Sequence, residues 1–338
     1  MTSHNILFTA PKVVELVEQP LSPPADNEFR LCAEVSLVSS GTESIALNGE
    51  FAAGSHWDNW VKYPFRPGYC MVGVVEEIGA GVESVRVGQR VASRVFHAQR
   101  QNVGAGFWTR TVSIPDAVSS EDAAWFGMAT IAQNGVRRAP HRLGDNVVII
   151  GAGLLGQLVT QYARAFGARE IVVIDTSPER LELAKNHGAS QVIGDLNGAR
   201  DIVRDLTKGR GADIVYDATG HPVVFAPALG LARDFGTLLL LGDSPDPSQQ
   251  RLTSDVMTRG VQIIAAHDGN PPHASSARDF WTHQEMSDLF FHFLQTGQMR
   301  VGDLITHRYT PQQAPQCYEM LLRDRSRALG VIFNWSQP

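Results

Sequence analysis

Runs of β-forming residues alternate with turn signals over the first 115 residues of the chain. Segments 12–18 and 29–39 are rich in β-formers, and segments 71–81 and 86–96 alternate around Gly-containing turns. This pattern predicts an all-β, barrel-like unit. Between these strands, residues 51–68 carry Trp and Gly without a clear periodicity, which predicts a long loop that carries function or is only surface.

The pattern changes near residue 119, after which apolar strands and helical segments alternate. Ser119 or Ser120 can cap the first helix, with Glu121 and Asp122 in its favourable first turn. Short apolar runs separated by helices are typical of a doubly wound parallel sheet. The runs are 146–151, 170–175, 190–194, 212–220, 236–242 and 261–267, and a helix over 283–297 and a strand over 329–335 follow.

Composition excludes several classes of protein. The chain of 338 residues is long enough for two domains, since single cores stop growing near about 250–300 residues. A formal net charge of −6 argues against a nucleic-acid partner, and no apolar run approaches the roughly 20 residues of a membrane helix. The first ten residues lack the pattern of a signal peptide. Three dispersed cysteines without a CxxC pair favour neither disulfides nor a structural zinc lobe, so a reducing cytoplasm is expected.

The segment 146–162 holds a glycine pattern with the full context of a dinucleotide-binding turn. Gly151, Gly153 and Gly156 stand in GxGxxG spacing between a buried strand and an amphipathic helix. The first glycine allows the tight turn, the second lets the backbone approach a pyrophosphate, and the third allows close helix–strand packing. The helix N-terminus, with Leu154 and Leu155, supplies oriented N–H groups.

An acid follows at the end of the second strand. Asp175 stands where a carboxylate would bind the adenosine ribose diol, and it would repel a 2′-phosphate, so NAD is favoured over NADP. Arg180 complicates this prediction, because it can flank the adenine or tolerate a phosphate. A glycine-rich turn without a ligand is the remaining alternative.

Taken together, these motifs resemble the medium-chain dehydrogenase/reductase superfamily over nearly the whole chain. The resemblance implies a GroES-like β-barrel catalytic domain, over 1–127 and 268–338, and a Rossmann NAD-binding domain over 128–267. A homodimer or homotetramer that acts on a small-molecule substrate is also implied. The segments that carry the resemblance are SSGTES (39–44), 67–91, GAGLLG (151–156), DATG (217–220), GTLLLLG (236–242) and GDLITHRYT (302–310).

The zinc-ligand positions of that superfamily have all changed here. Zinc-dependent members have Cys-Gly-Thr/Ser-Asp where this chain has Ser40, and Gly-His-Glu where it has Tyr69 and Cys70. Their third ligand falls near Gly127. A hydroxyl, a phenol and a glycine cannot form the tetrahedral N/S site that zinc prefers, so no metal is expected. The pattern looks most like the zinc-lacking branch that includes the bacteriochlorophyllide (hydroxyethyl) dehydrogenases.

Without zinc, proton transfer falls to positioned side chains. Tyr69 is the first candidate, because the resemblance places it near the nicotinamide; the alternative is a buried tyrosine that fills space. Thr42 matches the residue that contacts the substrate oxygen, and Ser40 could bind the same oxygen. Glu43 could orient or deprotonate Tyr69, and His97 titrates in the useful range. Each has a purely structural alternative: the Thr42 hydroxyl could bond only the backbone, Glu43 could be a surface acid, and His97 could be a solvated loop histidine.

The resemblance also implies residues around the nicotinamide, and His267 could reach the substrate with Asp268. Four aromatic residues, Trp57, Trp60, Phe96 and Trp108, could line an apolar pocket or belong to the core. The implied cofactor residues are Thr130, Ala218, Thr219, Gly242, Ala266 and His267.

The leading hypothesis is a zinc-independent, NAD-dependent oxidoreductase that acts on a secondary alcohol or its ketone. Three alternatives stay open. Retained NAD could oxidise and re-reduce a carbinol to epimerise it. The chain could be an enoyl or quinone reductase, although zinc-free relatives of that type generally use NADPH. It could also be a non-catalytic NAD(H)-binding protein.

Overall fold

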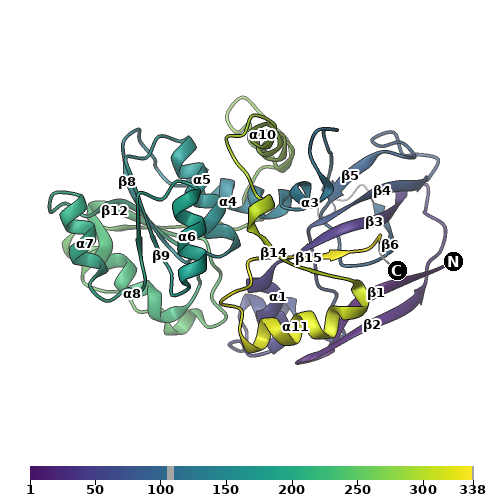
Figure 1. Cartoon of the computed structure of the whole chain (residues 1–338), viewed down its shortest axis with the longest axis horizontal. Helices are drawn as coiled ribbons and strands as arrows, with labels where there is room; N and C mark the ends of the chain where they lie inside the picture. Colours follow the sequence, from purple (N-terminus) through teal and green to yellow (C-terminus); the bar gives the residue numbers. More distant parts are fainter. Residues whose placement is uncertain (105–109, 337–338) are drawn as a thin grey trace. The chain divides into compact units, whose positions relative to one another are not determined.

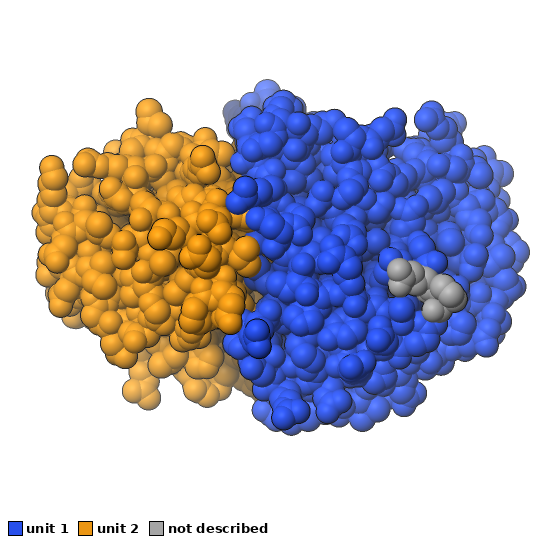
Figure 2. Space-filling model, in the orientation of Figure 1, with its two compact units in different colours: residues 1–50, 59–128, 272–338 blue, residues 51–58, 129–271 orange. Residues whose placement is uncertain are grey.

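The computed structural model describes residues 1–104 and 110–336. The chain divides into two compact units, shown in different colours in Figure 2. Unit 1 comprises Met1–Glu50, Asn59–Met128 and Pro272–Pro338, and unit 2 comprises Phe51–Asp58 and Ala129–Pro271.

Unit 1 is built on β-sheet, in agreement with the strand pattern of the sequence. Among its described residues one sheet has the order β14-β15-β3-β4-β5-β7, with β6 also paired to β3, and a second sheet pairs β1 with β2. The long central strand β3 is antiparallel to both β4 and β15, so the closing strand near residue 330 returns to the sheet of the N-terminal part (Figure 1). The strands are β1 (Thr2–Ala10), β2 (Val13–Pro20), β3 (Glu28–Val38), β4 (Met71–Ile78), β5 (Arg90–Ser93), β6 (Arg100–Gly104), β7 (Thr111–Ser113), β14 (Ile305–Tyr309) and β15 (Gly330–Asn334).

Helices connect these strands, and two of them begin at side-chain caps. The Ser119 hydroxyl accepts a hydrogen bond from the Asp122 N–H, so the cap expected at Ser119 or Ser120 is Ser119. Thr282 forms a capping box at the start of the helix predicted over 283–297. Ser39 precedes a helix that the sequence did not predict. The helices of this unit are α1 (Ser40–Asn48), α3 (Ser120–Ala123), α10 (His283–Gln295) and α11 (Ala314–Arg323), with short 3-10 turns η2 (Gly302–Leu304) and η3 (Pro311–Gln313).

The expected loop over 51–68 is not entirely loop, because a short helix, α2 (His56–Trp60), interrupts it. The flanking residues have no regular structure, which agrees with the missing periodicity. The next long helix, α4 (Phe126–Arg138), runs from the last residues of this part of unit 1 into unit 2.

Unit 2 contains a parallel sheet with the order β10-β9-β8-β11-β12-β13. This is the 3-2-1-4-5-6 order of a Rossmann fold, counted along the strands of the unit. Each strand matches one of the apolar runs. The strands are apolar along their length because both faces of such a sheet are covered. The elements are β8 (Asn146–Ile150), α5 (Leu154–Ala165), β9 (Glu170–Ile174), α6 (Pro178–Asn186), β10 (Gln191–Ile193), α7 (Ala199–Leu206), β11 (Ala212–Asp217), α8 (Pro222–Leu231), β12 (Ala232–Leu240), η1 (Pro247–Gln249), α9 (Asp255–Thr258) and β13 (Gln262–Ala265).

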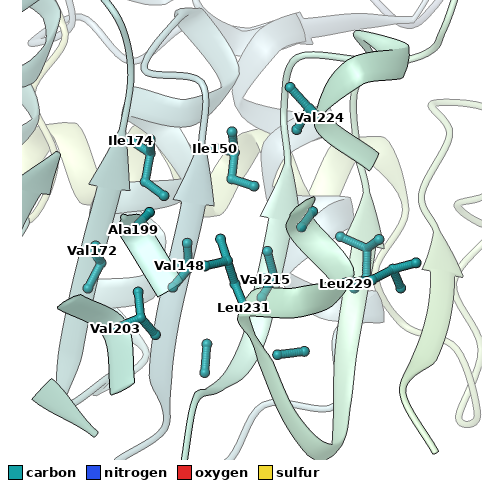
Figure 3. Close-up of a cluster of buried hydrophobic side chains, with 14 of the residues drawn as sticks. Val148, Ile150, Val172, Ile174, Ala199, Val203, Val215, Val224, Leu229 and Leu231 are labelled. Carbon is teal, nitrogen blue, oxygen red and sulfur yellow. The ribbon is translucent and has the colours of Figure 1, made fainter. Parts of the chain in front are cut away.

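One buried hydrophobic cluster of unit 2 lies between the sheet and the helices α7 and α8. Val148 and Val215 from neighbouring strands point toward Val203 of α7 and Leu229 of α8 in Figure 3. All four side chains are buried, and burial of one Val or Leu side chain contributes about 1.5–3 kcal/mol to folding. This packing fixes the carboxyl ends of the strands, where parallel sheets bind their ligands. No helix in the described part of the chain is both long and apolar enough to cross a membrane.

Candidate functional site

A cluster of three hydroxyl groups lies in unit 1 where β4 begins. Gly68 adopts φ +97°, a conformation suited to glycine, and turns the chain so that Tyr69 faces the start of α1. The Tyr69 hydroxyl donates to Ser39 Oγ at 2.5 Å, and Thr42 Oγ1 lies 3.4 Å from the same hydroxyl. The Arg94 guanidinium carbon is 5.2 Å from the centroid of the phenol ring. The cluster therefore combines a phenol, two aliphatic hydroxyls and a nearby cation.

The surroundings of Tyr69 keep its phenol protonated. Burial raises the pKa of Tyr69 well above its ordinary value, and Cys70 adds to this rise. The hydrogen bonds with Ser39 and Thr42 and the positive charge of Arg94 act in the opposite direction and lower that pKa. Since the rise is the larger effect, the phenol is a hydrogen-bond donor at neutral pH. Ser39, Thr42 and Arg94 keep its pKa from rising further.

Ser39 and Ser40 have different places at the start of α1. Ser40 is the first residue of α1 and is buried, whereas Ser39, at the N-cap position, makes no side-chain cap and its hydroxyl contacts Tyr69. The serine that contacts the phenol is therefore Ser39, which the sequence did not single out as a site residue, and the predicted contact of Ser40 with the substrate oxygen stays a prediction. The capping-box spacing in this segment joins Ser40 to Glu43, so the sequence offered no signal for Ser39.

Glu43 and His97 do not have the surroundings that were expected for them. Glu43 is buried, and within the described residues its carboxylate bonds the Ser39 N–H, the Tyr318 hydroxyl and the His97 ring rather than Tyr69. His97 is a fully buried residue and not a solvated loop histidine. Glu43 therefore makes no direct hydrogen bond to Tyr69 among these contacts, and its expected role in orienting Tyr69 stays a prediction. Tyr318 was missed, because nothing in its helical surroundings signals a polar role.

The former zinc-ligand positions do not offer a metal site. A Cβ at Gly127 would lie 2.5 Å from Cys70 Sγ, so the buried thiol fills the space that a ligand side chain would need. No group of three or more His, Cys, Asp or Glu side chains in the described chain could hold a metal ion. Ser40, Tyr69 and Gly127 lack the N and S donors of a tetrahedral zinc site, so these residues do not fit zinc.

The dinucleotide-type turn lies in unit 2 between β8 and α5. Gly151 has φ +96°, and a Cβ at Gly156 would lie 1.8 Å from the Gly151 carbonyl oxygen, so α5 packs directly on the turn. A Cβ at Gly153 meets nothing within 4 Å, which leaves open space above that residue. Leu154 and Leu155 begin the helix, whose first N–H groups have no partner within a helix. This geometry suits a pyrophosphate.

Asp175 connects the turn to the next strand. One carboxylate oxygen accepts the Ala152 N–H at 2.7 Å and the other accepts the Ser177 N–H at 2.8 Å. Arg180 lies in the first part of α6 and its N–H donates to the Ser177 hydroxyl at 3.3 Å. The acid predicted to bind the ribose therefore stands beside the glycine turn, half-buried, with its orientation fixed by two backbone bonds.

The carboxyl edge of the sheet is tightly packed beside the turn. A Cβ at Gly151 would lie 2.7 Å from Thr219 Cγ2, and a Cβ at Gly242 would lie 2.3 Å from Gly220 N. Asp217, which the sequence did not single out, accepts bonds from Thr219 N and Oγ1 at 2.9 and 2.6 Å. Burial raises the pKa of Asp217, and its second carboxylate oxygen has no hydrogen-bond partner among the described residues.

The remaining predicted residues have diverse environments. Thr130 is buried in α4, Ala218 follows β11, and Ala266 is buried after β13. His267 is exposed, and its carbonyl accepts a bond from Asn134 at 2.9 Å. Among the aromatic candidates, Trp57 is buried, Trp60 and Phe96 are exposed, and Trp108 lies outside the described residues.

A β-rich unit with a hydroxyl cluster, joined to a Rossmann unit with a glycine turn and an acid, defines the class of two-domain dinucleotide-binding proteins. Comparison with known families is more specific. A model described as an alcohol dehydrogenase GroES-like domain matches residues 35–121, and one described as a zinc-binding dehydrogenase matches residues 155–281.

Full-length relatives have the same organisation. D-guloside 3-dehydrogenase of Escherichia coli (strain K12) is 24% identical over 97% of this chain and 99% of its own length. A solved structure described as a short chain alcohol dehydrogenase from E. coli CFT073, complexed with NADH, superposes with a TM-score of 0.80 at 21% identity, covering 98% of this chain and 99% of that one. A putative zinc-binding dehydrogenase from Sinorhizobium meliloti 1021, bound to NADP, has a TM-score of 0.80 at 18% identity and covers 99% of both chains.

The chain belongs to the medium-chain dehydrogenase/reductase superfamily. The predicted fold class, a GroES-like catalytic domain with a doubly wound Rossmann domain, is confirmed. The closer resemblance to the zinc-lacking, bacteriochlorophyllide-type branch stays a prediction.

Proposed function

We propose that this chain is a zinc-independent, NAD-dependent oxidoreductase that transfers a hydride between NAD(H) and a secondary alcohol or its ketone. The named dehydrogenases among its full-length relatives support an enzyme of this type. The observation that carries the proposal is the hydroxyl cluster of Tyr69, Ser39 and Thr42, of which Tyr69 matches a zinc-ligand position by the resemblance in sequence.

The cluster can serve the proton that accompanies hydride transfer. When an alcohol is oxidised, its hydroxyl proton must leave as the hydride moves; in the reverse reaction the developing alkoxide needs a proton. In the ketone-reducing direction Tyr69, protonated at neutral pH, turns its O–H from Ser39 to that oxygen and donates to it. The Ser39 and Thr42 hydroxyls stabilise the phenolate that forms as the proton moves, since their hydrogen bonds lower the pKa of Tyr69.

The cofactor preference rests on Asp175. Gly151, Gly153 and the first N–H groups of α5 would hold the pyrophosphate, and the Asp175 carboxylate would bind the ribose diol and repel a 2′-phosphate. When bound, the nicotinamide supplies the hydride acceptor or donor. Because solved relatives hold either NADH or NADP, the preference for NAD depends on this residue of the chain itself.

Zinc independence rests on the chemistry of the donor set. The matched model described as zinc-binding covers residues 155–281 and therefore excludes Ser40, Tyr69 and Gly127. A Lewis-acid step has no support from these side chains, because the thiol of Cys70 occupies the space in front of Gly127. Proton transfer is thereby assigned to the hydroxyl cluster.

The test is a panel of secondary alcohols and ketones, followed by NADH absorbance, with wild type, Tyr69→Phe and a control. Tyr63→Phe is a matched control, because its hydroxyl donates to the Ala46 carbonyl of α1 and touches none of the cluster. Loss of a general acid lowers kcat by about 100-fold or more. We expect that loss for Tyr69→Phe at unchanged NADH affinity, and near-normal kcat for Tyr63→Phe. A Tyr69→Phe enzyme with wild-type turnover would refute the proposed role.

A further inference from the structure

A buried polar network lies directly behind the hydroxyl cluster, and its centre is the Glu43 carboxylate. One oxygen accepts the Ser39 N–H at 2.8 Å. The other accepts the Tyr318 hydroxyl at 2.5 Å and lies 3.1 Å from His97 Nε2. Glu43, His97 and Tyr318 have exposed fractions of 2%, 1% and 0%. A carboxylate so deeply buried is tolerated because several donors satisfy it.

His97 extends the network to the turn that carries Tyr69. Its Nδ1 is 2.7 Å from the Ser36 hydroxyl, which also accepts the Trp335 N–H at 2.9 Å. Its backbone N–H donates to the Pro67 carbonyl at 2.9 Å. A Cβ at Gly68 would lie 2.8 Å from the His97 ring, so the ring is packed against that turn. Rotation of the imidazole is therefore blocked by contacts on several sides.

The two ends of the network hold the two partners of the phenol hydrogen bond. The Glu43 carboxylate fixes the backbone of Ser39, and the Ser39 hydroxyl accepts the hydrogen bond of the Tyr69 O–H. The His97 ring fixes the turn immediately before Tyr69. The contact between Glu43 and His97 therefore joins segments that are far apart in the sequence and sets their separation.

The connection between Glu43 and Ser39 also excludes a simple proton relay along this path. Glu43 reaches Ser39 through a backbone amide, and an amide does not pass protons at neutral pH as a hydroxyl or imidazole does. The network can hold the cluster in place, but it offers no path of exchangeable side-chain protons from Ser39 to the carboxylate.

We propose that Glu43, His97 and Tyr318 are positioning residues, which fix the Tyr69–Ser39 hydrogen bond and do not themselves exchange protons with the substrate. The proposal rests on the proposed function for the role of Tyr69. It replaces the sequence-based assignment of Glu43 and His97 as catalytic residues and adds Tyr318 from the C-terminal helix α11.

The mildest disruption is Tyr318→Phe, because the ring keeps its edge contact with Phe8, at 4.9 Å between centroids, and only the hydroxyl is lost. Tyr63→Phe is again the matched control, since it also removes one phenol bond to α1. Hydrogen–deuterium exchange of the cofactor-free protein reports the positioning without any substrate. We expect faster exchange in residues 36–44 and 66–71 for Tyr318→Phe, and wild-type exchange at 66–71 for Tyr63→Phe.

Kinetics of the same variants, with the best substrate of the panel, test the consequence for turnover. Misplacement of a reacting group by about 1 Å costs up to about 100-fold in rate, so a partial loosening is expected to lower kcat about tenfold. NADH affinity and the apparent pKa values of the pH–rate profile should stay unchanged. In a Tyr69→Phe background, Tyr318→Phe should have almost no further effect, because both changes act on one hydrogen bond.

Three results would overturn the inference. One is wild-type exchange at 66–71 in Tyr318→Phe. A second is an additive kcat loss in the double variant. The third is a pH–rate profile that loses an ionisation, which indicates a proton relay. Wild-type turnover of Tyr69→Phe would instead overturn the proposed function, and the exchange measurement would still decide whether the network positions the two segments.

Discussion

Two alanine substitutions in the glycine turn of unit 2 should affect folding stability and NADH affinity differently. Gly156→Ala places a Cβ 1.8 Å from the Gly151 carbonyl oxygen. Since non-bonded carbon and oxygen atoms do not approach within about 3 Å, the turn or the start of α5 must move by more than about 1 Å. Gly153→Ala meets no protein atom within 4 Å, and its φ of −73° suits alanine.

The two variants should therefore separate stability from affinity. Overpacking lowers the free energy of unfolding of Gly156→Ala by about 1–3 kcal/mol. Displacement of the turn also removes at least one charge-assisted N–H···phosphate bond, worth about 1.5–3 kcal/mol, so NADH binds about 10- to 100-fold more weakly. For Gly153→Ala, alanine is a poorer N-cap residue than glycine, which destabilises the folded protein, but it also lowers the entropy of the unfolded chain, which stabilises the fold. The two effects oppose each other, and stability changes by less than about 1 kcal/mol. NADH affinity should still fall at least about tenfold, because the new methyl group occupies the space of the pyrophosphate.

NADH fluorescence titration and thermal unfolding of the same preparations measure both quantities. Gly230→Ala, near the end of α8, is the control, because a Cβ there also meets nothing within 4 Å. It should bind NADH like wild type. If Gly153→Ala binds NADH as tightly as Gly230→Ala does, the pyrophosphate does not lie over this turn and the assignment of the cofactor site is refuted.

Further predictions concern cofactor choice, metal content and pH. Asp175→Ser should shift the ratio of NADPH to NADH affinity toward NADPH by about tenfold or more, because the carboxylate that repels a 2′-phosphate is gone; an unchanged ratio in titrations with both cofactors would contradict this. Metal analysis of the purified protein should find far less than one equivalent of zinc, and a chelator should leave turnover unchanged; a full equivalent would contradict zinc independence. Burial lowers the pKa of His141 in the folded protein, despite the opposing charge of Asp145. Below the unfolded-state pKa of about 6.5, the unfolded chain therefore binds this proton more readily than the folded protein does. Stability should therefore fall as the pH decreases from about 6.5 toward the lower folded-state pKa, and His141→Gln should make the unfolding temperature less dependent on pH in that range; an equal dependence would contradict the assignment.

The dinucleotide turn was predictable because its determinants are local. A buried strand, three glycines and a helix lie within one short stretch, and the acid at Asp175 ends the next strand. The backbone requires glycine at Gly151, which has a positive φ, and at Gly156, which closely approaches the Gly151 carbonyl, whereas Gly153 leaves open space for a ligand. The apolar runs likewise predicted the parallel sheet, since strands buried on both faces have few polar positions.

The hydroxyl cluster was only partly predictable, because its contacts join distant residues. Tyr69 and Ser39 are 30 residues apart, Glu43 and His97 are 54 apart, and Tyr318 and Glu43 are 275 apart. A family resemblance indicated Tyr69, since it matches a known ligand position. The resemblance did not indicate Ser39, because Ser39 matches no ligand position and its contact with Tyr69 depends on how the start of α1 packs against the start of β4.

Two of the three positions that the resemblance matches to zinc ligands, Tyr69 and Gly127, are linked by packing through Cys70. Cys70 is buried with an exposed fraction of 1%, and its thiol lies in the space that any side chain at Gly127 would enter. A ligand at 127 therefore requires a change in the position of Cys70, which lies next to Tyr69 in the chain. Tyr69 in turn uses its hydroxyl to contact Ser39, the neighbour of the vacated Ser40 position. A side chain at position 127 thus requires Cys70 to move, and this packing is compatible with the proposed role of the hydroxyl cluster in handling the substrate proton.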